Sequence, residues 1–331
     1  MSHVRTFEIP TVMKHGLGSL SSLADEVKAL GMKRALVVCG AGIIGAGLLE
    51  QAESPLKAAN ISYAVFDRVV PNPSLAKVDE GTELYQSKEC DGLIALGGGS
   101  AMDTAKAIGV VAANGGSIRD YEWAEPQSIE RRSPPTICIP TTAGSGCKVT
   151  LWAVVTDPER KVKFNVGGAP LIAAWVELID PELTFDLPAD ITAGTGMDAL
   201  AHAIECYTCG YAQPLTDAVA LQAMEYIGQY LRVAFAQGHN VEARYQMSQA
   251  AMAYDTESAG AAHAMSQSAG GVHDVPHGAL TARLLGPVME YNHLGEPQKI
   301  RPYRHGSGGG RPWTEASGGR PQFGGGDREL L

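Results

Sequence analysis

The sequence predicts two halves of different fold class, an α/β half with a parallel sheet followed by an all-helical half. Short apolar runs alternate with amphipathic stretches through about residue 185, and three consecutive glycines directly follow one of these runs. From Ala189 onward the strand pattern disappears, and Ala, Met, Gln and Leu become frequent. Alternation of this kind favours a Rossmann-like parallel sheet with helices on both faces.

The expected elements follow from the period of their apolar residues. Uninterrupted apolar runs predict four buried strands, at residues 34–39, 62–66, 92–96 and 136–139. Amphipathic spacing predicts helices at residues 20–30, 75–87, 190–208, 215–236 and 241–254. Because the character of the chain changes at residues 180–188, we expect an α/β domain at 1–185, a helical domain at 186–300 and a separate tail at 301–331.

Composition and charge exclude several classes of protein. The chain of 331 residues has a net charge of −10, which argues against nucleic acid or an anionic membrane as a main partner. No stretch approaches the roughly 20 apolar residues that span a bilayer, and residues 1–14 have no signal-peptide pattern. The six cysteines are spread along the chain, as is typical of reduced thiols. The expected location is therefore the cytoplasm.

A glycine loop follows the third predicted strand and consists of Gly97, Gly98, Gly99 and Ser100. A helical stretch comes directly after it, so backbone N–H groups and the helix dipole would point at a ligand. Glycine would let a phosphate approach the backbone closely, and Ser100 would cap the helix. We interpret the loop as a pyrophosphate site, with a plain tight turn as the alternative.

A second glycine pattern competes with this loop. Gly40 begins a G-x-G-x-x-G sequence directly after the first predicted strand, and Asp67 ends the next strand. The pattern fits a dinucleotide fingerprint, although the spacing to Asp67 is longer than usual. It is short enough to recur by chance and is therefore the weaker candidate.

One acid and three histidines form the candidate metal site. Asp198 and His202 are four residues apart in a predicted helix, so their side chains share one face. His263 lies in another helical stretch, and His277 begins a third after a turn predicted at residues 270–275. One carboxylate and three imidazoles complete the coordination of a first-row divalent metal. His273 is also nearby, and ordinary core or surface histidines are the alternative.

Six motifs together carry a resemblance to a known family. They are PNPS from Pro71, GGGSAMDTAKAIG from Gly97, PTTAGSGCKVT from Pro140, DPELT from Asp180, TAGTGMDALAHAIE from Thr192 and PHGALTARLL from Pro276. In order and spacing they resemble the iron-containing (group III) alcohol dehydrogenases, over residues 7–292. The resemblance implies a dehydroquinate synthase-like architecture and an NAD(P)-dependent alcohol dehydrogenase.

The resemblance also implies roles for individual residues. The ligands of the metal, Fe²⁺ or Zn²⁺, would be Asp198, His202, His263 and His277. The glycine loop and Asp103 would bind the cofactor pyrophosphate. The rest of the nucleotide cleft would be lined by Asn72, Thr141, Thr142 and Lys163. The metal would act as a Lewis acid while hydride passes to the nicotinamide. Substrates would be primary alcohols, diols and aldehydes, and the chain would form a homodimer or larger assembly.

Several positions depart from the family pattern. Gly40 stands where members that use NAD usually carry an Asp that binds the adenosine ribose. Without that carboxylate a 2′-phosphate is not repelled, so we expect NADPH to be used at least as well as NADH. Cys147 and Lys148 replace a small polar residue and an acid beside the cofactor cleft. Gln267 replaces a histidine that faces the substrate, and His273 is the candidate to substitute for it.

The largest departure follows residue 292. The family continues there with amphipathic helices, whereas residues 301–331 contain nine glycines, five arginines and no lysine. We interpret this segment as a low-complexity, disordered tail that arises from truncation or a shifted reading frame, and the helical metal-binding domain as incomplete. A non-catalytic remnant and a glycerol-like polyol dehydrogenase are therefore alternatives to an active alcohol dehydrogenase.

Overall fold

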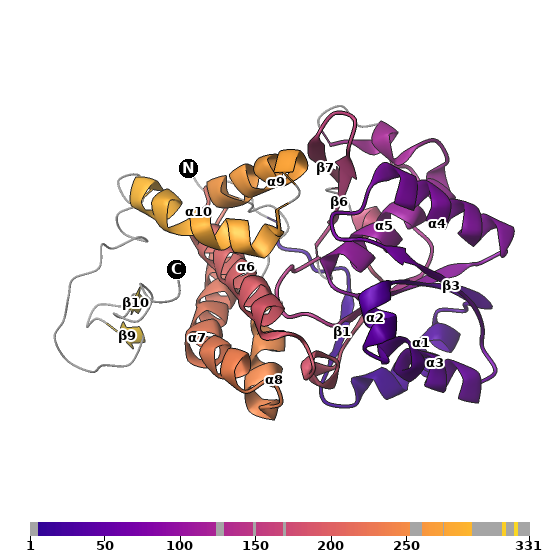
Figure 1. The fold of residues 1–331 in the computed structure, drawn as a ribbon, viewed down its shortest axis with the longest axis horizontal. Helices are drawn as coiled ribbons and strands as arrows, with labels where there is room; N and C mark the ends of the chain where they lie inside the picture. Colours follow the sequence, from indigo (N-terminus) through magenta and orange to yellow (C-terminus); the bar gives the residue numbers. More distant parts are fainter. Residues whose placement is uncertain are drawn as a thin grey trace.

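The structure is a computed structural model that places an α/β half beside a helical half (Figure 1). It describes residues 6–123, 129–147, 150–167, 170–251, 260–273, 275–292, 313–315 and 321–323. The two halves follow one another along the sequence, as the change of pattern near residue 185 predicts.

Six strands form one parallel sheet in the order β1-β8-β5-β4-β2-β3. Their bounds are β1 Val12–His15, β2 Arg34–Gly40, β3 Ser62–Val69, β4 Gly92–Gly97, β5 Thr136–Pro140 and β8 Val176–Ile179. The four predicted strands are β2 to β5, and all four are confirmed. The prediction missed β1 and β8, because each has only four residues, β1 is mostly exposed and β8 contains the acidic residue Glu177.

Helices cover both faces of this sheet, as predicted. They are α1 Leu23–Ala29, α2 Ala41–Gly45, α3 Leu48–Ala58, α4 Leu75–Ser87 and α5 Gly99–Asn114. Side chains alternate along β2, so that Leu36 and Val38 pack with α4 and α5, whereas Val37 and Cys39 pack with α1 and α3. The helix predicted at 20–30 is divided between α1 and a preceding 3₁₀ turn. The 3₁₀ turns are η1 Ser19–Ser22, η2 Ile118–Tyr121, η3 Pro170–Ile172 and η4 Pro181–Thr184.

An antiparallel hairpin stands apart from the main sheet. It consists of β6 (Trp152–Asp157) and β7 (Val162–Gly167), joined by a turn in which Lys161 has a φ of 56°. The prediction missed both strands, because their side chains alternate between buried and half-buried and form no continuous apolar run. The hairpin lies beside the helical half (Figure 1).

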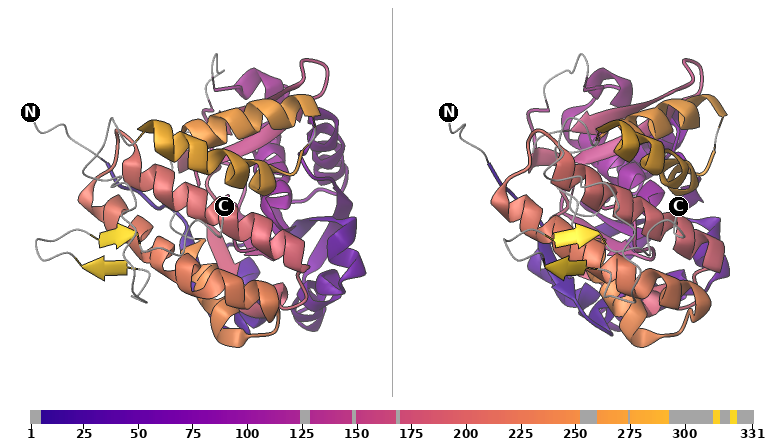
Figure 2. Two further views of the ribbon diagram at one scale, coloured as in Figure 1. Left: turned by 60° about the vertical axis from the view of Figure 1, so that its left-hand side comes forward. Right: turned by 90° about the vertical axis from the view of Figure 1, so that its left-hand side faces the viewer.

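Among the described residues of the second half there are five helices. They are stacked beside the α/β half (Figure 2). They are α6 Ala189–Thr208, α7 Pro214–Ala236, α8 Val241–Ala250, α9 Ala261–His273 and α10 His277–Asn292. Buried Ala, Met, Leu and Ile side chains of α6, α7 and α8 form a second core, which α10 joins through Leu285. The predicted helices at 190–208 and 215–236 are confirmed. The helix predicted to reach residue 254 ends at Ala250, and residues 252–259 lie outside the described part of the chain.

The turn predicted at residues 270–275 is wrong in its first part, because α9 continues to His273. Gly270 and Gly271 suggested the turn, yet here they bring the helix close to the hairpin. A Cβ atom at Gly270 would lie 2.9 Å from Lys163 Nζ, and one at Gly271 would lie 2.9 Å from the carbonyl oxygen of Lys161. These glycines therefore serve helix packing.

Two further strands lie near the end of the described chain. They are β9 (Trp313–Glu315) and β10 (Pro321–Phe323), which pair antiparallel. The other residues of the tail predicted to be disordered lie outside the described ranges. Among the helices that the structure describes, none combines the length and apolar character required to cross a bilayer.

Candidate active site

Two loops meet at the carboxyl edge of the sheet, where ligands bind in open α/β folds. The glycine loop connects β4 to α5, and a second loop, residues 141–147, follows β5. The Thr141 amide donates to the carbonyl oxygen of Gly97, at 2.9 Å. A Cβ atom at Gly98 would lie 3.3 Å from the Thr142 side chain, and one at Gly99 would lie 2.9 Å from Ser145 Oγ. The predicted residues Thr141 and Thr142 therefore pack directly on the glycine loop.

The start of α5 differs from the prediction in one respect. Its N-cap is Gly98, and Ser100 lies inside the first turn, where its carbonyl oxygen accepts a hydrogen bond from Thr104 Oγ1. The expectation that Ser100 caps the helix is therefore wrong. Without a capping side chain at this helix start, its first N–H groups keep the capacity to bind an anion.

A buried polar group lies beneath the two loops. Asp103 is 6% exposed, and burial raises its pKa to about 7 against the opposing charge of Lys106. Lys106 donates to the carbonyl oxygens of Thr150 at 2.6 Å and Trp152 at 3.1 Å, and also to that of Cys147. Burial raises the pKa of the Cys147 thiol well above its usual value. Asp103 thus faces the interior below the loops; Lys148 lies outside the described residues.

Gly40 lies at the end of β2 and is the N-cap of the short helix α2. A Cβ atom at this position would lie 2.8 Å from the carbonyl oxygen of Val69, at the end of β3. The missing side chain therefore allows β3 to approach the end of β2 closely.

Asn72 and Lys163 are brought together from distant parts of the sequence. Lys163 Nζ donates to Asn72 Oδ1 at 2.6 Å, and Asn72 has a φ of 54° in the loop after β3. The charge of Lys163 contributes to the pKa shifts of both Asp103 and His277. Lys163 therefore lies between the nucleotide loops and the histidines of the helical half.

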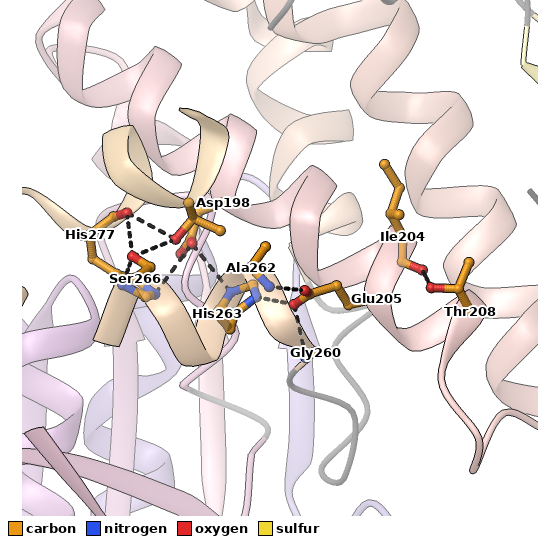
Figure 3. Close-up of polar contacts among 10 residues, drawn as sticks. Asp198, Ile204, Glu205, Thr208, Gly260, Ala262, His263, Ser266 and His277 are labelled. Atoms are coloured by element: carbon orange, nitrogen blue, oxygen red, sulfur yellow. Dashed lines mark hydrogen bonds and ion pairs between the residues drawn. The ribbon is translucent and has the colours of Figure 1, made fainter. Parts of the chain in front are cut away.

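The acid–imidazole cluster, defined as Asp198, His202, His263 and His277, joins α6, α9 and α10. Figure 3 shows three of its members, Asp198, His263 and His277. Asp198, His263 and His277 each offer one possible metal-ligating atom, and these three atoms all lie within 4.8 Å of one another. Asp198 Oδ1 is 3.5 Å from the Nε2 atoms of both His263 and His277. His202 stacks on His263, with ring centroids 4.2 Å apart, but is not part of the converging set.

The electrostatics of the cluster follow from burial and mutual charge. Burial and the charge of His263 lower the pKa of His202 to about 3. Burial also lowers the pKa of His277. Burial alone would also lower the pKa of His263, but the neighbouring carboxylates of Asp198 and Glu205 outweigh burial and raise that pKa to about 9. The histidines outweigh burial at Asp198 and hold its pKa below the usual range.

The residues present fit a divalent metal. Asp198 Oδ1 and His263 Nε2 are buried and have no hydrogen-bond partner within the described ranges. Buried polar atoms that lack partners are costly, so an ion between them would offset that cost. Carboxylate oxygen and imidazole nitrogen are ligands that Fe²⁺ and Zn²⁺ accept.

The prediction missed the residues that orient the imidazoles. His263 Nδ1 is 2.5 Å from Glu205 Oε2, and His277 Nδ1 is 2.9 Å from Ser266 Oγ. His202 has a hydrogen bond with the backbone of Gly144. Glu205 had a sequence signal, because it follows Asp198 by seven residues on the same helix and so shares its face. The other two contacts depend on tertiary packing.

His273 does not join the cluster. It is exposed at the end of α9, ten residues after His263 and therefore roughly 15 Å along the helix axis. Gln267 follows His263 by one helical turn and is half-buried, so it lies closer along the helix to the cluster than His273 does. The expectation that His273 substitutes for a histidine at position 267 gains no support from this placement.

Known proteins resemble this chain over most of its length. Residues 10–181 match the family described as iron-containing alcohol dehydrogenase, and residues 192–305 match the C-terminal region of the same family. A choline dehydrogenase of Bacillus subtilis (strain 168) is 55% identical over 305 residues, which cover 91% of this chain and 76% of that protein. An NAD-dependent methanol dehydrogenase of Bacillus methanolicus is 39% identical over 89% of this chain and 77% of the relative.

The comparison with solved structures points to the same kind of enzyme as the comparison of sequences. The crystal structure of a 1,3-propanediol oxidoreductase has a TM-score of 0.86 and 36% identity, covering 90% of this chain and 78% of that one. A NADH-dependent butanol dehydrogenase of Thermotoga maritima has a TM-score of 0.82 and 27% identity, covering 91% and 79%. The fold, the motifs and these matches together establish that the chain belongs to the iron-containing alcohol dehydrogenase family and is an alcohol oxidoreductase.

Proposed function

We propose that this chain transfers hydride between a short primary alcohol or diol, or the corresponding aldehyde, and a nicotinamide cofactor at a divalent-metal site. The observation that carries the proposal is the convergence of Asp198, His263 and His277 within 4.8 Å of one another. The charge of Lys163 acts both on His277 and on Asp103 beneath the nucleotide loops, so the cluster lies on the side of the helical half that faces those loops. Relatives support the substrate class, because choline, methanol and 1,3-propanediol all carry a primary hydroxyl on a short chain.

The metal proposal assigns roles to the cluster. Asp198, His263 and His277 would hold Fe²⁺, or Zn²⁺, with His202 as the fourth ligand. When bound, the metal would supply a Lewis acid for the substrate oxygen, and the nicotinamide would carry the hydride. Burial and the charge of His263 lower the pKa of His202, which favours the neutral imidazole that a metal ligand needs, whereas His263 would have to lose the proton that Asp198 and Glu205 stabilise. Ser266 orients His277 through its other ring nitrogen.

The nucleotide proposal assigns roles to the carboxyl edge of the sheet. The uncapped start of α5 and the glycine loop would bind the pyrophosphate. Thr141, Thr142, Asn72 and Lys163 would line the cleft. Asp103, which the resemblance assigned to the pyrophosphate, is buried, and we propose that it supports the loops from below instead. Gly40 offers no carboxylate to a ribose, so we expect NADPH to be used at least as well as NADH. All six cysteines lie in the described part of the chain and no disulfide joins them there, which supports a location in the cytoplasm. A homodimer or larger assembly stays a prediction from the family.

The metal assignment can be tested by analysis of metal content. After anaerobic loading with Fe²⁺ or Zn²⁺ and removal of unbound ions, the wild-type chain should retain about one metal per chain. Asp198→Ala should retain almost none, because it removes the carboxylate that faces both His263 and His277.

Asp190→Ala is the matched control, because Asp190 is an exposed acid in the first turn of the same helix. This variant should bind metal as the wild type does. Equal metal content in the wild type and Asp198→Ala would show that the ion binds elsewhere and would reject the site.

A further inference from the structure

Glu205 is a buried acid on the same face of α6 as Asp198 and His202. It is 4% exposed, and its carboxylate accepts three hydrogen bonds (Figure 3). The donors are the Gly260 amide at 2.9 Å, the Ala262 amide at 2.7 Å and His263 Nδ1 at 2.5 Å. All three donors come from residues 260–263, at the start of α9. A single side chain of α6 therefore fixes both the position of this helix start and the imidazole that it carries.

We propose that Glu205 is the positioning residue for the metal ligand His263. A carboxylate can only accept, so in the neutral imidazole the proton lies on Nδ1, and Nε2 keeps the lone pair that a metal needs. Nε2 is the atom that lies 3.5 Å from Asp198 Oδ1. This inference rests on the metal site proposed above, and assigns to Glu205 the choice of nitrogen that faces the ion.

The same carboxylate caps α9 from outside that helix. The amides of Gly260 and Ala262 are among the N–H groups that a helix start leaves without intrahelical partners. A Cβ atom at Gly260 would lie 2.5 Å from Glu205 Oε1, so the glycine lets the backbone approach the carboxylate. The competing interpretation is that Glu205 holds α9 in place and has no influence on the metal.

Asp180 makes it possible to separate these two interpretations. It is also a buried acid, 3% exposed, and accepts hydrogen bonds from the amides of Gly18, Leu20 and Glu182, each at 3.1 Å. No imidazole is among these donors, and Asp180 lies in the α/β half. A change from acid to amide at Asp180 should therefore cause a similar loss of backbone hydrogen bonds without altering a residue that contacts a proposed metal ligand.

The test compares Glu205→Gln with Asp180→Asn. Glutamine keeps the shape of the side chain but removes the negative charge that raises the basicity of the His263 imidazole, and this holds in either orientation of the amide. It also turns one oxygen into a donor, so at least one of the three hydrogen bonds is lost. Titration of the metal-free chains with Zn²⁺ should give a Kd for Glu205→Gln that is roughly 10–100-fold weaker than that of the wild type. Thermal unfolding of the metal-free chains should show a lower Tm for both variants, whereas Asp180→Asn should keep the wild-type Kd.

Three results would overturn the proposal. An unchanged Kd for Glu205→Gln, together with a lower Tm, would mean that Glu205 is only a helix cap. An equal loss of affinity in Asp180→Asn would attribute the effect to general destabilisation. A wild-type chain that binds no Zn²⁺ would reject the metal site itself, and with it the role of Glu205.

Discussion

Gly40 combines a packing role with the role in cofactor choice that we propose for it. A side chain here would meet the carbonyl oxygen of Val69 at 2.8 Å, so the close approach of β2 and β3 depends on glycine. Glycine also removes the carboxylate that would repel a 2′-phosphate. The packing effect and the charge effect would both arise from a side chain at position 40, so a test must separate them.

We therefore predict the effect of Gly40→Asp on cofactor preference. The new carboxylate should lower the ratio of kcat/KM for NADPH to that for NADH by at least about tenfold, equivalent to about 1.4 kcal/mol. The contact with Val69 should also destabilise the fold by about 1–3 kcal/mol. Steady-state kinetics with both cofactors, and denaturant unfolding, measure the two effects.

Gly40→Ala is the control for Gly40→Asp, because it carries the same Cβ atom without charge. It should lose similar stability and keep the wild-type preference. A wild-type chain that clearly prefers NADH, or a ratio that changes equally in both variants, would contradict the role given to Gly40.

The residue types of the site could be predicted better than their environment. Asp198, His263 and His277 converge as the resemblance implied, although they come from three different helices. Helical spacing placed His202 on the same face as Asp198, but it could not show that His202 lies outside the converging set. Ser266 and Gly144 could not be found in this way, because they contact histidines of other elements. The cap assigned to Ser100 is wrong, since the N-cap is Gly98 and the helix starts two residues earlier than the prediction places it.

Helix crossings in the second half depend on single glycines. Gly278 in α10 faces the backbone of Gly194 in α6, and a Cβ atom at Gly278 would lie 2.3 Å from the Gly194 carbonyl oxygen. His277 directly precedes Gly278 in the sequence, so the helix crossing at Gly278 sets the position of this proposed metal ligand.

Gly278→Ala should therefore destabilise the chain by about 1–3 kcal/mol, because backbone atoms cannot move away as a flexible side chain can. It should also lower metal content by displacing His277. Denaturant unfolding and metal analysis check both expectations.

Gly194→Ala, on the other side of the same crossing, is the matched control. Its nearest neighbour would be the Ala279 amide nitrogen at 4.0 Å, an ordinary contact, and alanine favours the helix by up to about 1 kcal/mol. If the two alanine variants proved equally stable, the close crossing of α6 and α10 would be refuted.

Whole elements were predictable where the apolar pattern is long and continuous. The strands β2 to β5 and the helices α4, α6 and α7 satisfy this condition. The hairpin β6–β7 does not, because it is half-buried and its role is to contact α9. The glycines of α9 were mistaken for a turn, since close packing between elements and a turn both favour glycine.

At the scale of the molecule, tight contacts join the two halves. A Cβ atom at Gly144, in the loop after β5, would lie 2.4 Å from the carbonyl oxygen of Thr195 in α6. On the other side of the junction, Gln249 of α8 contacts His15 of β1 at 3.1 Å. These contacts hold the acid–imidazole cluster beside the carboxyl edge of the sheet, where the nucleotide loops lie.

The proposed reaction uses residues of both halves, so a measurement of activity tests the nucleotide site and the metal site together. A non-catalytic remnant would keep the fold of each half without turnover. A polyol enzyme of glycerol type would turn over, but with a different preference in a substrate panel. Choline, methanol, 1,3-propanediol and glycerol form a panel that separates the polyol alternative from the proposed class.

The most direct measurement is oxidation of NADPH and NADH with a short aldehyde, using chain reloaded anaerobically with Fe²⁺ or Zn²⁺ and Asp198→Ala as control. We predict metal-dependent turnover in the wild type, with NADPH at least as good as NADH, and loss of turnover in the variant. No turnover with either metal or either cofactor would contradict the proposed function and favour a chain that keeps the fold without the reaction.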